Sequence, residues 1–311
     1  MSIFFRAVFL SLGAALFSGV NGFLTKAAVS EVGDPVVFTF LKNAIVSLIF
    51  FGVFLWFRKS NEIREASSRD KRLLFLIGIV GGGIPFLLYF SGLSMIPAAT
   101  AVFIHKTLFL WVAMLAVPFL GERVDWLHAF ALGLLLFGVL LFQVPVWHSF
   151  GLGEVLVLLA TILWAVENIL AKKVLHHISS LSAMSARMIL GSVVIFCWLV
   201  LSGKVGIAFS LSWSAWGWTF LTSLLLVGYV SCWYRALSLA PAGFVASLLV
   251  PAAFITGALS SIFVTGTISA SSLAGWLSLA LGIALLSWKV APLFPKGREH
   301  QLLRVPAGRS V

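Results

Sequence analysis

The sequence predicts an all-α polytopic membrane protein with ten transmembrane helices, arranged as two inverted five-helix repeats. Three observations predict this fold: the composition is strongly apolar, ten stretches are long enough to cross a bilayer, and the two halves of the chain match each other. Of the 311 residues, 61% are hydrophobic and only 10% are charged, and the mean hydropathy is +1.10. Soluble domains carry about a quarter charged residues. We therefore expect almost the whole chain to lie within a membrane.

The individual spans follow from length, because a hydrocarbon core of about 30 Å needs about 20 apolar helical residues. Ten stretches meet this requirement: 6–28, 35–57, 73–94, 97–119, 124–143, 151–173, 181–202, 214–237, 242–264 and 270–290. The first of them lacks a clean small-residue cleavage site, so we expect a retained helix and not a signal peptide. Only the loop at 58–72 and the tail at 291–311 are long and polar.

The distribution of basic residues predicts that both termini lie in the cytoplasm. With the N-terminus inside, the inner connections hold sixteen of the 21 Lys and Arg residues, whereas the outer side holds only Lys26 and Lys204. Such an excess of positive charge is typical of cytoplasmic loops. The net charge of +11 is thus spread over short connections, and nucleic acid is not an expected partner. We expect an integral protein of a bacterial or archaeal plasma (inner) membrane.

An internal repeat links the two halves of the chain. VNGFLTK at 20–26 aligns with VENILAK at 166–172, which brings Lys42 opposite Arg187 after a one-residue difference in loop length. GLSMIPAATAVF at 92–103 aligns with ALSLAPAGFVAS at 236–247. Because each half has an odd number of spans, the second half crosses the bilayer in the opposite sense. The sequence predicts one repeat at 1–145, an inverted repeat at 146–290 and a basic cytoplasmic tail at 291–311.

Several motifs resemble one transporter family. The five-plus-five pattern, YRALSLAPAGFVASLLVP at 234–251, FLGER at 119–123 and LHAFALGLLLFGVLLF at 127–142 resemble the drug/metabolite transporter superfamily, EamA type. The resemblance covers the whole chain apart from the tail. Two departures are VTGTISA at 264–270, where the family often repeats Gly-Glu, and Thr107, which stands opposite Pro251.

The resemblance implies a transporter of small molecules and not an enzyme, and it leaves the substrate open. Members of the superfamily export amino acids and other metabolites, move drugs, or exchange sugar phosphates and nucleotide sugars. A shared fold does not fix which of these applies here.

Lys106 and His105 are the first candidate site residues. An ionisable side chain at the bilayer centre costs at least about 2.5–3.5 kcal/mol unless it is paired or faces water. Lys106 lies about 14 Å into the core if its helix starts at Pro97. It is a candidate anchor for a substrate carboxylate or phosphate, and the alternative is a lysine that caps backbone carbonyls or pairs with a helical carboxylate. The positions opposite the pair, Leu249 and Val250, are apolar, so the inverted symmetry is broken here.

Two roles are open for the His105 side chain. Its ordinary pKa near 6.5 makes it a candidate proton carrier or hydrogen-bond donor to substrate. An interhelical hydrogen bond is the alternative. The resemblance supports a role for Lys106, since sugar-phosphate members use a lysine on the fourth helix, but helix nine of this sequence lacks a clear second cation.

Glu167 is the only acidic residue deep in a span, and its depth matches that of Arg187 on the next helix. One interpretation is a structural ion pair between the two. The other is that Glu167 faces a cavity, where it serves proton coupling or binds an amino group. Its counterpart Asn21 belongs to a polar stripe on the first helix and is a candidate for lining the site. Lys42 mirrors Arg187 and is a further candidate for coupling or ion pairing.

Glycine, proline and aromatic residues supply the remaining candidates. Gly81, Gly82, Gly83 and Pro85 interrupt the third span and Gly228 falls at the related place in the eighth, so all are candidates for hinges or for close helix packing. Six aromatic residues that lie deep or next to the breaks are candidates for stacking on a ring-bearing substrate or for filling the wall: Tyr89, Trp111, Trp164, Tyr229, Trp233 and Tyr234.

These observations lead to a function class. The sequence has no P-loop, HExxH motif, paired intramembrane aspartates or Ser/His dyad, and Cys197 and Cys232 have no metal-binding spacing, so we expect no enzyme, metal or cofactor. Within the predicted spans, the three cations Lys42, Lys106 and Arg187 outnumber the single acidic residue, Glu167. We therefore expect a secondary transporter that exports a small anionic or zwitterionic metabolite, an amino acid or organic anion, by alternating access.

Two alternatives stay open. One is a sugar-phosphate or nucleotide-type exchanger, or a broad drug exporter, of the same superfamily. The other is a non-transporting scaffold or lipid-binding protein whose basic loop and tail contact anionic lipid. The expected partners are a small-molecule substrate and the lipid bilayer, with a proton or a counter-substrate as coupling species, and the protein is expected as a monomer or a homodimer.

Overall fold

The protein is helical throughout the part of the chain that the structure describes. The computed structural model describes residues 2–142, 150–266 and 270–293, and every regular element in these ranges is a helix. Nine of the described helices are long and apolar enough to cross a membrane, and a tenth, shorter apolar helix covers Trp126–Leu141. The predicted all-α polytopic membrane fold is confirmed.

The helices follow the predicted spans in order. The first half contains α1 (Ile3–Val32), α2 (Pro35–Trp56), α3 (Ser60–Glu65), α4 (Ser68–Ile77), the π-helix η1 (Gly78–Gly83), α5 (Ile84–Leu93), α6 (Ala98–Lys106), α7 (Leu108–Leu120) and α8 (Trp126–Phe142). The second half contains α9 (Leu152–Val174), α10 (Ser180–Leu201), α11 (Val205–Phe209), α12 (Trp213–Leu239), α13 (Ala242–Ser247), α14 (Pro251–Ser260), the π-helix η2 (Ser261–Thr265), α15 (Ala270–Val290) and the 3₁₀ turn η3 (Ala291–Leu293).

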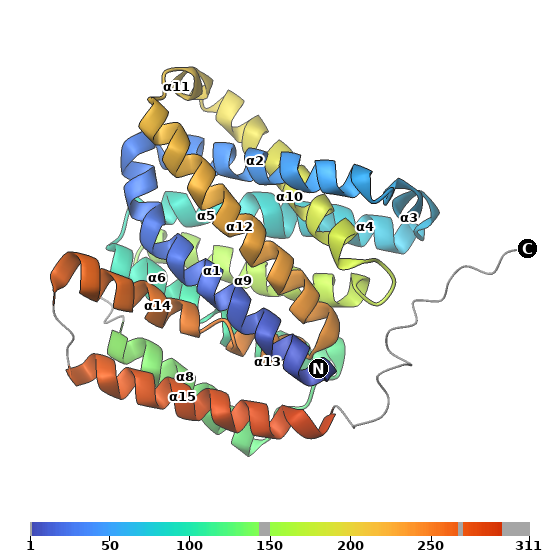
Figure 1. Cartoon of the computed structure of the whole chain (residues 1–311), viewed down its shortest axis with the longest axis vertical. Coiled ribbons are helices and arrows are strands. Elements are labelled where there is room, and N and C mark those ends of the chain that lie inside the picture. Colours follow the sequence, from blue (N-terminus) through green and yellow to red (C-terminus); the bar gives the residue numbers. More distant parts are fainter. Residues whose placement is uncertain (1, 143–149, 267–269, 294–311) are drawn as a thin grey trace, which may run out of the picture.

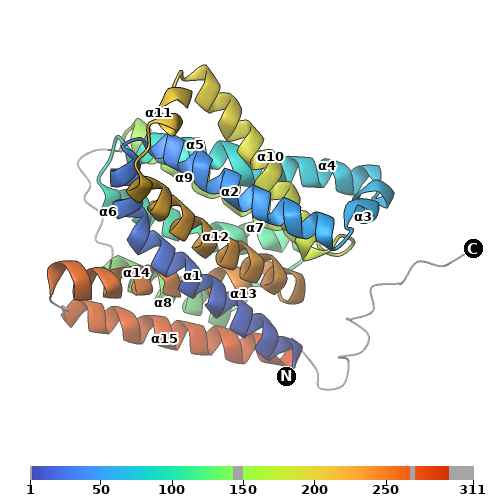
Figure 2. The ribbon, with the colours of Figure 1, turned by 45° about the horizontal axis from the view of Figure 1, so that its top comes forward.

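Helices from the two halves are interleaved. In Figures 1 and 2, α1 lies beside α12 across the middle of the molecule, and α8 pairs with α15 along one edge. Helix α2 packs against α10, and α9 contacts α4, α5, α6 and α7. Helix α9 of the second half therefore has first-half helices as its main neighbours. Its side chains can form contacts between the two halves.

The fourth and ninth spans are each broken at the same place in the repeat. In the first half α6 ends at Lys106 and α7 begins at Leu108, with Thr107 between them. In the second half the break falls at residues 248–250, just before Pro251. Proline explains the second break, because it lacks an N–H and clashes with the preceding turn. In the first, the Thr107 hydroxyl donates to the Ile104 carbonyl over 2.6 Å, a local bond that competes with the helical ladder.

Polar contacts at the helix ends tie the halves together on one side. Asp34 caps the start of α2 by accepting from the N–H groups of Val36 and Val37, and it also pairs with Lys204, whose Nζ lies 2.6 Å from Oδ2. Partial burial acts to raise the pKa of Asp34. The hydrogen bond and charge of Lys204, with the two N–H groups, outweigh burial and lower that pKa below its ordinary value. This pair therefore joins the start of α2 to the connection after α10.

At the opposite end, the short helix α3 is held against the start of α10. Glu62 accepts from the N–H and hydroxyl of Ser179 and from the hydroxyl of Ser182, and it also pairs with Lys59. Partial burial acts to raise the pKa of Glu62, but the N–H of Ser179, Lys59 and the two hydroxyls outweigh it and lower the pKa. The ionised carboxylate thus fixes the connection between α2 and α4.

A glycine of η1 allows the backbones of η1 and α10 to approach closely. A Cβ added at Gly82 would lie 2.2 Å from the carbonyl oxygen of Arg187 and 2.9 Å from the Cα of Gly191. Both obstacles are backbone atoms of α10, which cannot rotate away as a side chain can. The close packing of η1 against α10 therefore depends on the absence of a side chain at Gly82.

Substituting Gly82→Ala is expected to destabilise the fold by about 1–3 kcal/mol, the usual cost of overpacking. The measurement is the midpoint of thermal unfolding of the purified protein in detergent. Gly217→Ala is the matched control, because an added Cβ at this helical glycine meets nothing within 4 Å. Equal midpoints for the two variants would contradict the packing explanation.

Candidate functional site

The candidate site is built around one face of α9. Trp164, Glu167 and Asn168 follow one another at i, i+3 and i+4, a spacing that puts side chains on the same face of a helix. All three are buried, with 8%, 2% and 3% of their surface exposed. A helix in a membrane rarely buries such polar groups unless neighbouring helices supply partners. Each of these side chains has its partners on other helices.

Glu167 is the centre of a buried ionic group. The Tyr234 hydroxyl of α12 donates to Glu167 Oε1 over 2.5 Å, and Arg187 Nε of α10 lies 3.6 Å from the same oxygen. Arg187 is only 6% exposed, and its Nη2 donates to the Gly81 carbonyl over 3.2 Å. Because Glu167 and Arg187 carry opposite charges, this group contributes no net charge to the site.

The Gly81 carbonyl joins the ionic group to an aromatic cluster. It also accepts a hydrogen bond from the indole Nε1 of Trp164 over 3.0 Å. Gly81 lies in the π-helix η1, where the wider turn disturbs the regular hydrogen-bond ladder and leaves carbonyls for other donors. The interruption of the third span therefore supplies a binding group for side chains of both α9 and α10.

Three of the predicted site residues, His105, Tyr89 and Trp164, have their rings in mutual contact. The His105 ring lies 4.8 Å from the Trp164 ring and 5.4 Å from the Tyr89 ring, and Tyr89 and Trp164 are 5.7 Å apart, all between centroids. Phe86 adds an edge contact to Trp164 at 5.3 Å. His105 Nδ1 is buried and has no hydrogen-bond partner among the described residues. The cluster thus presents aromatic faces and one unused polar atom.

Lys106 occupies the last position of α6, directly before the break. Its side chain is only partly exposed, and among the described residues it takes part in no ion pair or side-chain hydrogen bond. Trp111, one turn into α7, donates from its indole to the Thr107 hydroxyl over 3.1 Å. Trp111 therefore supports the break, and within the described ranges its ring makes no contact with the aromatic cluster around Trp164.

Two other predicted residues form a separate contact. Lys42 of α2 donates to the Asn21 Oδ1 of α1 over 2.9 Å. They are not in contact with the Glu167 group in the described structure. Gly228 lies within α12, which runs through it without a break, and a Cβ there would lie 2.7 Å from the Phe17 ring. Gly228 thus allows close packing of α12 on α1.

Further residues contact the site, and two of them, Tyr229 and Trp233, are among the deep aromatic candidates that the sequence indicated. The Asn168 side-chain oxygen accepts from the indole of Trp233 over 3.1 Å, and Tyr229 stacks on Trp233 with ring centroids 6.0 Å apart. Glu122 accepts from the N–H groups of Ala242 and Gly243 at the start of α13. The FLGER motif gave a signal for Glu122, but only the fold shows which helix it reaches.

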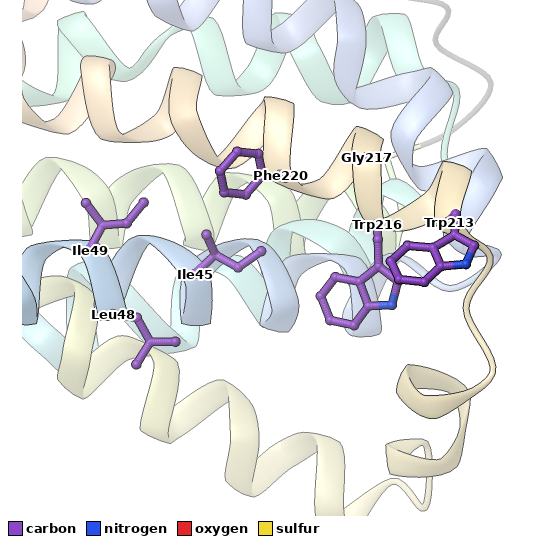
Figure 3. Close-up of a pocket in the computed structure, with 7 residues that line it drawn as sticks. All are labelled: Ile45, Leu48, Ile49, Trp213, Trp216, Gly217 and Phe220. Atoms are coloured by element: carbon purple, nitrogen blue, oxygen red, sulfur yellow. The ribbon is translucent and has the colours of Figure 1, made fainter.

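A surface groove lies apart from this site. It encloses a volume of about 580 Å³ between α2 and α12, and Figure 3 shows its lining of Ile45, Leu48, Ile49, Trp213, Trp216, Gly217 and Phe220. Apart from two indole N–H groups the lining is apolar, so the groove cannot orient a charged substrate. In the described ranges no cluster of three or more His, Cys, Asp or Glu residues could hold a metal ion.

Comparisons with known proteins agree with this architecture. A solved crystal structure matches with a TM-score of 0.75 at 15% sequence identity, covering 92% of this chain and 98% of the other, and this likeness concerns the fold alone. No curated protein sequence matches this one. The family profile described as "EamA-like transporter family" matches twice, at residues 5–143 and 151–288. The chain, with its two matched halves and interrupted helices, belongs to the EamA-like transporter family.

Proposed function

We propose that the protein is a secondary transporter that exports a small anionic or zwitterionic metabolite, an amino acid or an organic anion, by alternating access. Membership of a transporter family supports transport as such. The observation that carries the substrate class is Lys106, a deep cation at a helix break without an ion-pair partner among the described residues.

The charge balance favours a substrate with one negative group. Arg187 is offset by Glu167, whereas no carboxylate in the described part of the chain forms an ion pair with Lys106. A cation removed from water gains most from an anion that replaces its lost hydration. One lysine matches the single charge of a carboxylate better than the double charge of a phosphate ester. A cationic drug would be repelled.

The neighbouring rings suit the rest of such a substrate. His105 precedes Lys106 and touches Trp164 and Tyr89, so a molecule held by Lys106 would lie near aromatic faces and the unused His105 Nδ1. Glu167 and Arg187 lie behind Trp164, joined to it through the Gly81 carbonyl. In this proposal Glu167 supports the wall or couples a proton, and Gly81–Gly83 with Pro85 permits movement of the third span.

The same proposal includes the setting of the protein. Both termini lie in the cytoplasm of a bacterial or archaeal plasma membrane, and residues 1–145 and 146–290 act as the two inverted repeats, followed by the tail 291–311. The excess of Lys and Arg on one side supports this orientation. A proton or a counter-substrate drives transport, and the unit is a monomer or a homodimer.

Lys106→Met is expected to abolish the thermal stabilisation that a carboxylate-bearing ligand gives to the purified protein. A ligand at a hundred times its Kd stabilises by about 2.7 kcal/mol, so the lost shift is measurable. The screen compares amino acids, organic acids, phosphate esters and cationic aromatic compounds. Lys26→Met is the matched control, because Lys26 is exposed near the end of α1.

An unchanged shift in Lys106→Met would remove this lysine from the site. Stabilisation by phosphate esters or cations alone would contradict the proposed substrate class. Proteoliposome uptake of the compounds that stabilise the protein then tests transport. Absence of uptake, with and without a pH gradient, would favour the scaffold or lipid-binding alternative.

A further inference from the structure

A second buried cation lies away from Lys106, at the contact between α1 and α2. Lys42 is only 8% exposed, and its Nζ is 2.9 Å from Asn21 Oδ1. The ammonium also lies 5.3 Å from the centre of the Phe38 ring. An amide oxygen and a ring face are the partners that the described structure gives to this charge.

These partners do not neutralise Lys42. An amide and an aromatic ring supply partial charges only, and an ammonium has three N–H donors to satisfy. Among the described residues no carboxylate forms an ion pair with Lys42. A buried charge without a counter-charge is costly, and in membrane proteins it usually marks a functional position. The site is therefore short of one negative charge.

The inverted repeat shows which group is missing. Asn21 aligns with Glu167, and Lys42 aligns with Arg187. In the second half the carboxylate of Glu167 lies 3.6 Å from the Arg187 guanidinium and also accepts from Tyr234. In the first half an amide occupies the carboxylate's position. The contact of Lys42 with Asn21 thus repeats the Glu167–Arg187 arrangement with its negative charge removed.

The partner of Lys42 is less buried than its counterpart in the second half. Asn21 is partly exposed, as are Ser18 and Thr25 on the same face of α1, whereas Glu167 is 2% exposed. The Thr25 hydroxyl donates to the backbone carbonyl of Asn21, so it does not compete with Lys42 for the Asn21 side-chain oxygen. The partly exposed Asn21 is the side from which we expect a small anion to reach Lys42, which is itself only 8% exposed.

We propose that Lys42 and Asn21 form a second anion site, which takes one small monovalent anion in the place of the missing carboxylate. The anion is either the carboxylate of a transported molecule or a chloride co-ion, and both present the same charge to Lys42. The first source rests on the proposed function, and the second does not. The Lys42 ammonium supplies the charge, and the Asn21 side-chain NH₂ is free to donate to the bound anion.

The test supplies the missing charge from within the protein. Thermal unfolding of the purified protein is titrated with chloride and separately with acetate, at constant ionic strength held by a bulky sulfonate salt. The wild type is expected to show a saturable rise in unfolding midpoint. Asn21→Glu is expected to have a raised midpoint without added anion and an apparent anion affinity lower by about tenfold or more. Asn21→Gln, which adds length but no charge, keeps the response.

The outcomes separate this site from the one at Lys106. A response to chloride alone identifies a co-ion, and a response to acetate as well identifies a carboxylate site. Lys42→Met is expected to lose the chloride response, while Lys106→Met and Lys26→Met keep it, even if no transport substrate is found. An acetate response that Lys42→Met removes and Lys106→Met keeps belongs to the Lys42 site, whereas one that only Lys106→Met removes belongs to the site of the proposed function. If Asn21→Glu does not fold, the proposal is tested by comparing the anion-induced rise in unfolding midpoint of Lys42→Met with that of Lys26→Met. No response in the wild type, or a full response in Asn21→Glu or Lys42→Met, would overturn the proposal.

Discussion

Glu167→Gln is expected to destabilise the protein by about 3–5 kcal/mol, because removing one partner of a buried ion pair leaves the other charge uncompensated. Arg187 is 6% exposed, and Glu167 Oε1 is the carboxylate oxygen that the structure places 3.6 Å from it. The variant also weakens the short bond from Tyr234, which now meets a neutral amide. The measurement is the unfolding midpoint, with the free energy taken from denaturant titration in mixed micelles.

The double variant Glu167→Gln with Arg187→Met distinguishes an ion pair from simple packing. If the two charges compensate each other, the double variant is more stable than the sum of the two single losses implies. Lys204→Gln is the control, since Lys204 pairs with Asp34 but its side chain is 40% exposed. Exposed pairs contribute about 1 kcal/mol or less. Additive losses in the double variant would contradict the ionic group.

The ion-pair result bears directly on the role of Glu167. If Glu167→Gln is unstable but an added Arg187→Met restores both stability and ligand-induced stabilisation, then Glu167 supports the wall of the site. If stability returns but transport does not, the carboxylate has a second role in coupling. Arg187 and Trp164 both donate to the Gly81 carbonyl, so a change in the ionic group can alter the position of the Trp164 ring.

The fold was predictable because hydrophobic length and loop charge are local properties of the sequence. The repeat alignment places Thr107 opposite Pro251; in the structure the fourth span is broken at Thr107 and the ninth at residues 248–250, directly before Pro251. The break at Thr107 was harder to predict. A proline would have indicated it, whereas a threonine breaks the ladder only through its hydroxyl bond to Ile104.

The contacts within the site depend on packing between helices, which the sequence does not specify. The equal depth of Glu167 and Arg187 suggested a contact, and the contact exists at 3.6 Å. Nothing in the sequence indicated that His105 would touch Trp164, because the two lie on spans four and six. The Gly81 carbonyl is a backbone group whose availability depends on a π-turn. Such a binding group can be located only in a structure.

Glu122→Ala is expected to loosen the start of α13 and to cost about 3–5 kcal/mol, since hydrogen bonds to a charged group contribute about 1.5–3 kcal/mol each. The Glu122 carboxylate accepts from the N–H groups of Ala242 and Gly243, so a first-half residue caps a second-half helix. The α12–α13 corner is also held by Lys172, whose Nζ donates to the Leu237 and Ala240 carbonyls.

The loosening is measured by hydrogen–deuterium exchange at residues 242–247. In Glu122→Ala the Ala242 and Gly243 amides lose their acceptor, so residues 242–247 are expected to exchange faster. Glu122→Gln keeps one acceptor oxygen and is expected to lie between Glu122→Ala and the wild type. Glu154→Ala is the matched control. Glu154 accepts from the Gly151 N–H at the start of its own helix α9, so its loss affects exchange near residue 151 only.

The same pair of variants tests whether this corner limits movement between the halves. Among the described contacts, the two Glu122 bonds couple the end of α7 to α13, which leads into the broken ninth span. If alternating access requires this coupling to open, Glu122→Ala speeds conformational exchange and Glu154→Ala does not, although both remove a carboxylate cap. Faster exchange at 242–247 with unchanged transport kinetics would show that the corner frays without limiting the cycle, and equal exchange in both variants would contradict the capping role itself.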